Sequence, residues 1–282
     1  NRRSRGLGDV YKRQINNIRP IMNAETEVLH RLAQSFYTFF RTGVFRSEQI
    51  DIGKLTLEQA YECQHYFHKL RIADGDRPIG YKVGCTSAAI REQFGVDEPI
   101  CGLIMTPGLL CEGDVVDSNN YCQLAIEPEF VITLKQDLAK LPTSDKALLD
   151  AIEFVQPGIE LHNYVYHFSP LKQQEVICSN GIHAAQLIGN NKVRAREVHW
   201  QLEGVAVFKN GELVASGVAA DIMGSPLNSL RFLIQHLRKR GEGLKVGELV
   251  IPGSATALIS VVAGDEITCS FTNVGSVTMK VV

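Results

Sequence analysis

The spacing of apolar residues changes from a helical to a strand-like pattern near residue 80. Apolar residues recur at helical spacing over residues 24–41 and 56–72, which predicts two amphipathic helices. Thr56 and Gln59 have capping-box spacing at the start of the second helix, and Asp74 and Gly75 follow its end. The N-terminal part of the chain is therefore predicted to be helical.

Beyond Gly80 the apolar runs become short and are separated by Gly, Asp, Asn and Pro, a pattern typical of strands. Asn210 and Gly211 stand between two such runs and predict a hairpin, because this pair suits a type I′ turn. The predicted strands are residues 80–85, 126–134, 158–163, 204–209, 212–216, 248–252, 257–262, 265–272 and 275–282.

Helices interrupt these strands without alternating with them. The last predicted helix has Ser225 as its cap, Pro226 at its first position and Gly241 just past its end. Many strands with few helices favour an α+β fold with a mainly antiparallel or mixed sheet over a doubly wound fold. The helices predicted here span residues 87–94, 144–154 and 226–240.

The charge is unevenly distributed along the chain of 282 residues, whose net charge is -2. Residues 1–19 contain six Lys or Arg and one Asp, a charge of +5, which leaves -7 for the remainder. An acidic body argues against a nucleic-acid partner. The stretch SRGLGDVYKRQ resembles a translated library adaptor, so residues 1–21 are interpreted as a non-native or disordered extension. A basic tail that binds nucleic acid or membrane is the alternative.

Composition also bears on the cellular compartment. No uninterrupted apolar run of membrane-spanning length and no signal-type apolar segment occur, which predicts a cytoplasmic protein without a membrane partner. The seven cysteines are odd in number and form no CxxC pair, so neither a disulfide framework nor a zinc site is predicted.

The segment IEPEFVITL, residues 126–134, places two carboxylates in an otherwise apolar strand. Glu127 and Glu129 would share one face, with Cβ atoms about 6.5 to 7 Å apart. If both were buried without a partner, one would have to be protonated, whereas a bound Mg²⁺ or Mn²⁺ would remove that conflict. The alternative is a solvent-facing strand with two ordinary glutamates.

A third acidic residue strengthens the metal hypothesis. In QPGIELHNY, Glu160 lies between Ile159 and Leu161, so it is again a charge on a half-buried strand. Three glutamates would fill one face of an octahedron and leave positions for water and substrate.

Two further residues are candidates for acid–base chemistry. Lys82 lies in the predicted strand IGYKVGCTS, where it either extends from a sheet edge to solvent or acts as a general acid or base. Near a cation and away from water, its pKa would fall. Asp97 in FGVDEP has the setting of a turn former.

Polar residues in two loops are candidates for substrate binding. Gly253 and Ser254 in PGSATA could bind a carboxylate or form an ordinary turn. Asn180 and His183 precede an apolar run, and a histidine there is more often structural than a ligand. His162 and His167 give weaker signals still.

Five segments in order make the chain from residue 24 onward resemble the 2-keto-4-pentenoate hydratase and 4-oxalocrotonate decarboxylase branch of the fumarylacetoacetate hydrolase superfamily. They are GYKVGCTSAAIREQFGVDEP, IEPEFVITL, PGIE, GSPLNSLRFLIQHLRKRGEGLKVGELVIPGSATA and AGDEITCSFTNVGSVTMKV. The resemblance implies a fumarylacetoacetase-like mixed β-sandwich or roll, residues 107–282, after an N-terminal α/β portion, residues 22–106. It also implies one Mg²⁺ or Mn²⁺ and a homo-oligomer.

The resemblance assigns roles residue by residue. Glu127, Glu129 and Glu160 match the metal ligands. Lys82 and Asp97 match the catalytic pair, and Ser254 matches a residue that contacts the substrate carboxylate. The chain departs from the family pattern at Val165, where relatives commonly carry a basic residue, and in SNGI, where they often read DNAS.

The leading functional hypothesis is a metal-dependent lyase that hydrates a 2-hydroxy-2,4-dienoate to a 4-hydroxy-2-oxo acid. Lys82, oriented by Asp97, would shuttle the proton. The alternatives are decarboxylation of a 2-oxo diacid, hydrolysis of a 2,4-dioxo compound with His183 as base, and a noncatalytic metal-stabilised oligomer. Decarboxylation needs a site for a second carboxylate, and no Arg stands in the expected places.

Overall fold

The computed structural model describes residues 24–46, 50–88, 91–92 and 96–282. The predicted extension, residues 1–21, lies outside these ranges, and so does part of the helix predicted at residues 87–94.

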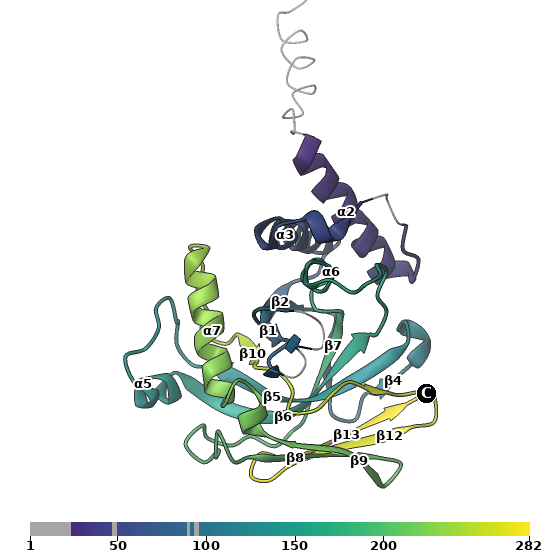
Figure 1. Cartoon of the computed structure of the whole chain (residues 1–282). Coiled ribbons are helices and arrows are strands. Elements are labelled where there is room, and N and C mark those ends of the chain that lie inside the picture. The colour runs from purple at the N-terminus through teal and green to yellow at the C-terminus, as the bar shows by residue number, and fades with distance from the viewer. Residues whose placement is uncertain (1–23, 47–49, 89–90, 93–95) are drawn as a thin grey trace, which may run out of the picture.

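Two sheets and a helical layer form the molecule (Figure 1). Helices α2 (Ala24–Thr42) and α3 (Leu57–Ala73) lie at the top of the view, and α7 (Pro226–Lys239) lies along the left side. The capping box of α3 is present, because the Thr56 side chain accepts from the Gln59 N–H and the Gln59 side chain accepts from the Thr56 N–H. These helices confirm the predicted helical N-terminal part.

The larger sheet has eight strands and carries the candidate site. β1 pairs with β10 and β3 pairs with β7 in parallel, while the other pairs are antiparallel. The strand order is β2 (Ile100–Met105), β1 (Pro78–Gly84), β10 (Leu249–Ile251), β5 (Leu124–Leu134), β6 (Ile152–Asn163), β7 (His183–Ile188) and β3 (Leu109–Cys111), with β11 (Ile259–Ser260) paired to β5.

The smaller sheet lies at the bottom of Figure 1 and has five strands. Its β8–β9 hairpin turns at Asn210 and Gly211, whose φ values of 56° and 85° are the positive angles that a type I′ turn requires. The strand order is β4 (Val115–Val116), β13 (Gly275–Val281), β12 (Glu266–Phe271), β8 (Gly204–Lys209) and β9 (Glu212–Val218).

Strand β5 is buried on both of its faces. On one face Phe130 packs against Phe271 of the smaller sheet, with ring centroids 4.9 Å apart. On the other face Val131 joins a small apolar cluster with Ile104 and Ile251 inside the larger sheet. The two faces together explain why β5 reads as an almost continuous apolar run.

Some elements differ from the predictions. The helix predicted at residues 144–154 is shorter, because α5 (Asp145–Asp150) ends where Ile152 pairs with Leu134 and begins β6. Strands β2, β3, β4 and β7 and helix α6 (Gln173–Cys178) were not predicted. Short 3₁₀ turns occur at η1 (Ile52–Lys54), η2 (Ser118–Asn120) and η3 (Ala219–Asp221).

The α+β fold class is confirmed, with a mixed sheet and few helices. The predicted division near residue 106 stays a prediction; β1 and β2 precede it and pair within the same sheet as β5. None of the helices in the described ranges is both long enough and apolar enough to cross a membrane.

Candidate active site

The pairing of β5 with β6 brings the predicted carboxylates together. Glu127 lies directly opposite Glu160, and Glu129 lies opposite Gly158, so all three carboxylates project from one face. A Cβ on Gly158 would lie 2.5 Å from Val131 Cγ2, so a larger residue opposite Glu129 would force its neighbours to move. Like charges directly across a strand pair are unfavourable, so this face requires a positive partner.

Glu127, Glu160 and His162 form a cluster in which one ligand atom of each lies within 4.8 Å of the others. His162 Nε2 is 3.1 Å from Glu127 Oε2 and 3.6 Å from Glu160 Oε2. Glu160 Oε2 and His162 Nε2 are buried and form no hydrogen bond within the described part of the chain. Buried polar atoms that converge without hydrogen bonds fit a divalent cation.

The other oxygen of Glu160 is fully engaged by the protein. Lys82 Nζ lies 2.9 Å from Glu160 Oε1, and His183 Nδ1 lies 2.7 Å from the same atom. Burial acts to raise the pKa of Glu160, but Lys82, His162 and His183 outweigh it and the pKa falls well below its usual range. Glu160 is therefore ionised, with Oε1 bound and Oε2 available.

Lys82 is almost fully buried and its ammonium group also approaches the Gly181 carbonyl at 3.5 Å. Burial acts to lower the pKa of Lys82, but the negative charges of Glu160 and Glu127 outweigh it, so the pKa is raised. The sequence analysis predicted that the pKa of Lys82 falls, because it assumed a nearby cation. In this structure the carboxylates raise that pKa instead.

Glu129 is 1% exposed, and its Oε2 accepts a hydrogen bond from the Gly253 N–H at 3.1 Å. Burial, followed by the negative charges of Glu160 and Glu127, raises its pKa well above the usual range. A cation between these carboxylates would oppose that shift.

Curling of the larger sheet brings Lys82 to Glu160. Strand β1 is three places from β6 in the strand order, which is about 14 Å in a flat sheet. The 2.9 Å contact between Lys82 and Glu160 requires the sheet to curve around the site. Glycines make room for the lysine, because a Cβ on Gly181 would lie 3.0 Å from Lys82 Nζ.

A cavity of about 160 Å³ opens beside the carboxylates. Lys82, Glu127 and His162 line one side of it. Burial raises the pKa of Cys85 to about 11, and it raises the pKa of Tyr166 further still, so both are uncharged at neutral pH. The remaining walls are uncharged and comprise Gly84, Cys85, Ile100, Tyr164, Tyr166, Val176, Gly181, Ile182, Ala257 and Leu258.

The other predicted site residues lie in varied settings. Asp97 is exposed in a bend, and among the described residues Lys82 contacts Glu160 and Gly181. The Asn180 side chain bonds the Leu103 N–H at 2.8 Å, the Leu103 carbonyl at 2.9 Å and His68 at 2.8 Å. These bonds give Asn180 a structural role, and its contact with substrate stays a prediction.

Ser254 is buried in the loop that follows β10, and its Oγ accepts a hydrogen bond from the Thr256 N–H at 3.1 Å. Neighbouring Gly253 has φ 112°, and a Cβ there would lie 2.4 Å from Thr86 Oγ1. Glycine therefore allows the loop to approach closely enough to donate its N–H to Glu129.

His162 is the residue of the cluster that sequence reasoning undervalued. It follows Glu160 by two positions in β6, so strand alternation places both on one face. The sequence Glu160-Leu161-His162 therefore contained this signal. His183 contacts Glu160 from the neighbouring strand β7. This contact depends on the pairing of β6 with β7, which the sequence analysis did not predict.

Comparison with known proteins gives matches over most of the chain, although no family model matches. The chain is 27% identical over 246 residues to a 2-keto-4-pentenoate hydratase of Paraburkholderia xenovorans, covering 87% of this chain and 91% of that protein. The structure of a 4-oxalocrotonate decarboxylase from Pseudomonas putida G7, complexed with magnesium and adipate, superposes with a TM-score of 0.85 at 28% identity. That match covers 91% of this chain and 98% of the decarboxylase.

A fumarylpyruvate hydrolase from Pseudomonas aeruginosa, in complex with Mn²⁺ and pyruvate, has a TM-score of 0.58 at 16% identity and shows a shared fold. This match covers 73% of this chain and 89% of the hydrolase. The predicted resemblance to the hydratase and decarboxylase branch of the fumarylacetoacetate hydrolase superfamily is thus confirmed.

Proposed function

We propose that this protein, which resembles the hydratase and decarboxylase branch, is a divalent-metal-dependent lyase that adds water to a 2-hydroxy-2,4-dienoate. The observation that carries the proposal is the group of Glu127, Glu129, Glu160 and Lys82, of which all but Glu127 are buried. Lys82 and Glu127 line a cavity whose other walls, apart from His162, are uncharged. A small 2-oxo or 2-hydroxydienoic acid is the proposed substrate, and the product is a 4-hydroxy-2-oxo acid.

Glu127, Glu129 and Glu160 would hold the Mg²⁺ or Mn²⁺, with His162 beside Glu127. When bound, the cation supplies positive charge that stabilises an enolate oxygen and orients a 2-oxo acid. Glu160 connects this function to the acid–base group, because its Oε1 binds Lys82 while its Oε2 faces the cluster.

Lys82 is the proposed proton carrier. It would transfer a proton between the 2-hydroxyl group and the carbon chain as the dienol becomes a ketone, after which water adds at C4 of the conjugated alkene. Glu160 orients the ammonium group in the structure. Gly181 supplies a second contact through its carbonyl oxygen. The orientation of Lys82 by Asp97 stays a prediction.

The cavity walls favour hydration over decarboxylation of a diacid. A second substrate carboxylate needs a cation, and within the described lining Lys82 is the one Lys or Arg. The decarboxylase neighbour was solved with adipate, a dicarboxylate. We infer that the substrate of this chain has an uncharged tail against Tyr164, Tyr166 and Ile182.

Turnover of a 2-hydroxy-2,4-dienoate tests the proposal. Chelator-stripped protein with Mg²⁺ or Mn²⁺ restored should remove the ultraviolet absorbance of the dienoate without releasing CO₂. Lys82→Met should abolish this activity, whereas Lys54→Met, at an exposed position, should not. Release of CO₂ would establish decarboxylation, and no turnover with stoichiometric metal would support a noncatalytic protein.

A further inference from the structure

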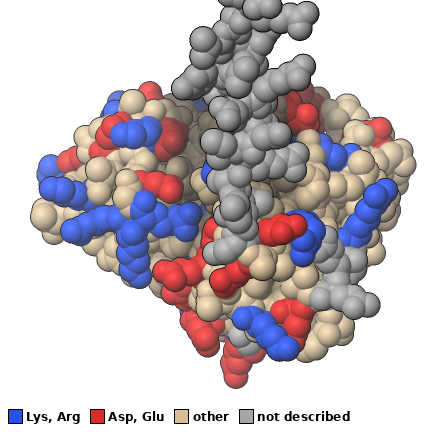
Figure 2. Space-filling model, turned by 90° about the horizontal axis from the view of Figure 1, so that it is seen from above, with Lys and Arg blue, Asp and Glu red and all other residues tan. Residues whose placement is uncertain are grey.

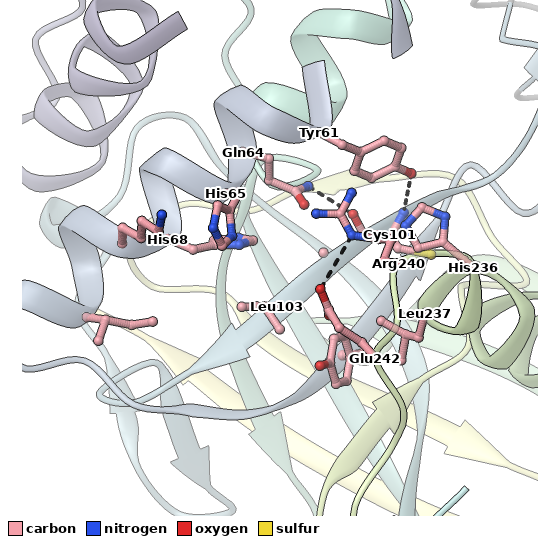
Figure 3. Close-up of a pocket in the computed structure, with 14 residues that line it drawn as sticks. Tyr61, Gln64, His65, His68, Cys101, Leu103, His236, Leu237, Arg240 and Glu242 are labelled. Carbon is pink, nitrogen blue, oxygen red and sulfur yellow. Dashed lines mark hydrogen bonds and ion pairs between the residues drawn. The ribbon is translucent and has the colours of Figure 1, made fainter. Parts of the chain in front are cut away.

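A second cavity, of about 270 Å³, is larger than the one beside the carboxylates, and Figure 3 draws the residues that line it. Successive residues of a strand point to opposite faces, so Tyr81 lines this cavity while Lys82 points into the active site. Its walls come from α3, β1, β2 and the C-terminal end of α7. The two cavities are therefore separate.

Helix α3 presents polar side chains to this cavity where a helix packed on a sheet normally presents apolar ones. Gln64 is buried and donates to the Cys101 and Ile177 carbonyls, each at 2.9 Å. His68 is buried and bonds Asn180 at 2.8 Å. These hydrogen bonds hold both side chains in place, so this wall of the cavity is polar and preformed.

Arg240 carries positive charge at the end of α7, where it lines the cavity. Figure 3 shows its guanidinium group between Tyr61 and Glu242. Its Nε lies 3.6 Å from Glu242 Oε1, longer than a hydrogen bond, and its carbon lies 5.7 Å from the Tyr61 ring centroid. A guanidinium group has five N–H donors in a fixed fork, and this one is only loosely paired in the structure.

More basic residues lie at or near this cavity. Lys69 lines the cavity from α3. The last turn of α7 adds the basic residues Arg238 and Lys239. Figure 2 shows Lys and Arg side chains on the left of the view, the side on which Figure 1 places α7, with Asp and Glu side chains among them. Basic side chains that line the cavity attract an anion.

The remaining walls are flat and uncharged. The rings of Tyr61 and His236 lie 4.7 Å apart, and Leu103 and Leu237 complete the apolar surface. Burial lowers the pKa of His236 to about 4, with Arg240 acting in the same direction, so its ring is neutral near pH 7. The volume corresponds to about nine water molecules, which suits a small molecule.

We propose that this cavity is a second binding site, which takes a small planar organic carboxylate. The carboxylate pairs with the Arg240 guanidinium group in place of Glu242, and the planar body lies against Tyr61 and His236. The site is independent of the metal cluster and of the proposed hydratase activity.

Benzoate binding to the full-length protein tests this site. Isothermal titration of the Mg²⁺-loaded protein, repeated after chelation, should show one binding event per chain that survives metal removal. Arg240→Gln should weaken that event about tenfold or more, because a charge-assisted bidentate contact is lost. Arg194→Gln, an exposed change outside the lining of this cavity, should leave it within about twofold.

Two other results would overturn the proposal. Benzoate binding that disappears with the metal would place the ligand at the carboxylate cluster, and equal affinity in the wild type and Arg240→Gln would exclude the guanidinium contact. Benzyl alcohol, which has the same ring without the charge, should bind at least about tenfold more weakly. Unchanged melting temperatures would confirm that both variants fold.

Discussion

Glu160 is the residue in which the two halves of the site meet, because its two oxygens have different surroundings. Oε1 contacts Lys82 and His183, whereas Oε2 faces Glu127 and His162. A buried carboxylate of this kind is ionised only because positive charge surrounds it. The consequence is that structural stability and metal binding depend on the same side chain.

Replacing Glu160 with Leu should destabilise the fold by about 3–5 kcal/mol in metal-free buffer, because Lys82 would be left buried without its counter-charge. Urea unfolding measures this change. The double variant Lys82→Met/Glu160→Leu should recover a large part of the loss, since it removes both charges. A single variant as stable as the wild type would show that the ion pair is unimportant.

The uncharged walls of the active-site cavity lead to a second prediction at this scale. A dienoate with an alkyl tail should have a kcat/KM at least about tenfold higher than one with a terminal carboxylate, because the described lining offers no second cation. Steady-state kinetics on the matched pair measures the ratio. Equal or reversed preference would favour a diacid substrate.

Strand alternation made part of the site predictable from sequence, since it is a local property. Glu127 and Glu129 share a face by spacing alone, and the same rule applied to Glu160 would also have selected His162. The contacts that join Lys82 and His183 to Glu160 depend on sheet curvature and on strand order. Neither property is written in a short segment of sequence.

Among the elements, β2 packs closely against the active site at Gly102. A Cβ on Gly102 would lie 2.6 Å from Asn180 Oδ1 and 3.2 Å from Lys82 Cγ. The glycine thus lets β2 pack against the turn after α6 and against the lysine at once.

Gly102→Ala should therefore lower the free energy of unfolding by about 1–3 kcal/mol and reduce turnover, because Asn180 or Lys82 must move. Denaturant unfolding and dienoate kinetics measure the two effects. Gly53→Ala is a suitable control, since its added Cβ would meet neighbours only at 3.4 Å, an ordinary contact. Identical behaviour of the two variants would refute the packing argument.

Elements with strong local signals were predictable, and others were not. The caps of α3 and α7 and the Asn210-Gly211 turn correspond to observed features. Strands β2 and β7 escaped prediction because Gly102 interrupts ICGLIM, and HAAQLI carries His and Gln that face the site. The end of α5 was placed too late because pairing with β5 overrides helical propensity at Ile152.

At the scale of the whole molecule, several histidines enter the fold uncharged. Burial lowers the pKa of His68 to about 3, and it lowers the pKa of His167 and His236 to about 4. The unfolded chain binds protons on these rings below about pH 6.5, whereas the folded chain does not. Folding is therefore favoured above that pH and loses stability as the pH falls.

His68→Gln should reduce the loss of stability between pH 7 and pH 5 by about 2 kcal/mol, because one proton uptake on unfolding is removed. Urea unfolding at the two pH values measures the difference. His199→Gln, at an exposed position, should leave the pH dependence of the wild type. An unchanged slope in His68→Gln would mean that His68 is not neutral in the fold.

A Mn²⁺ titration of the chelator-stripped chain, followed by electron paramagnetic resonance, tests most directly whether the carboxylate face of β5 and β6 holds a cation. We predict one saturable equivalent per chain in the wild type and in Glu153→Ala, an exposed change on β6, and its loss in Glu127→Ala and Glu129→Ala. A wild type without a saturable site, or a Glu127→Ala variant that binds as the wild type does, would contradict the metal site and the lyase chemistry built on it.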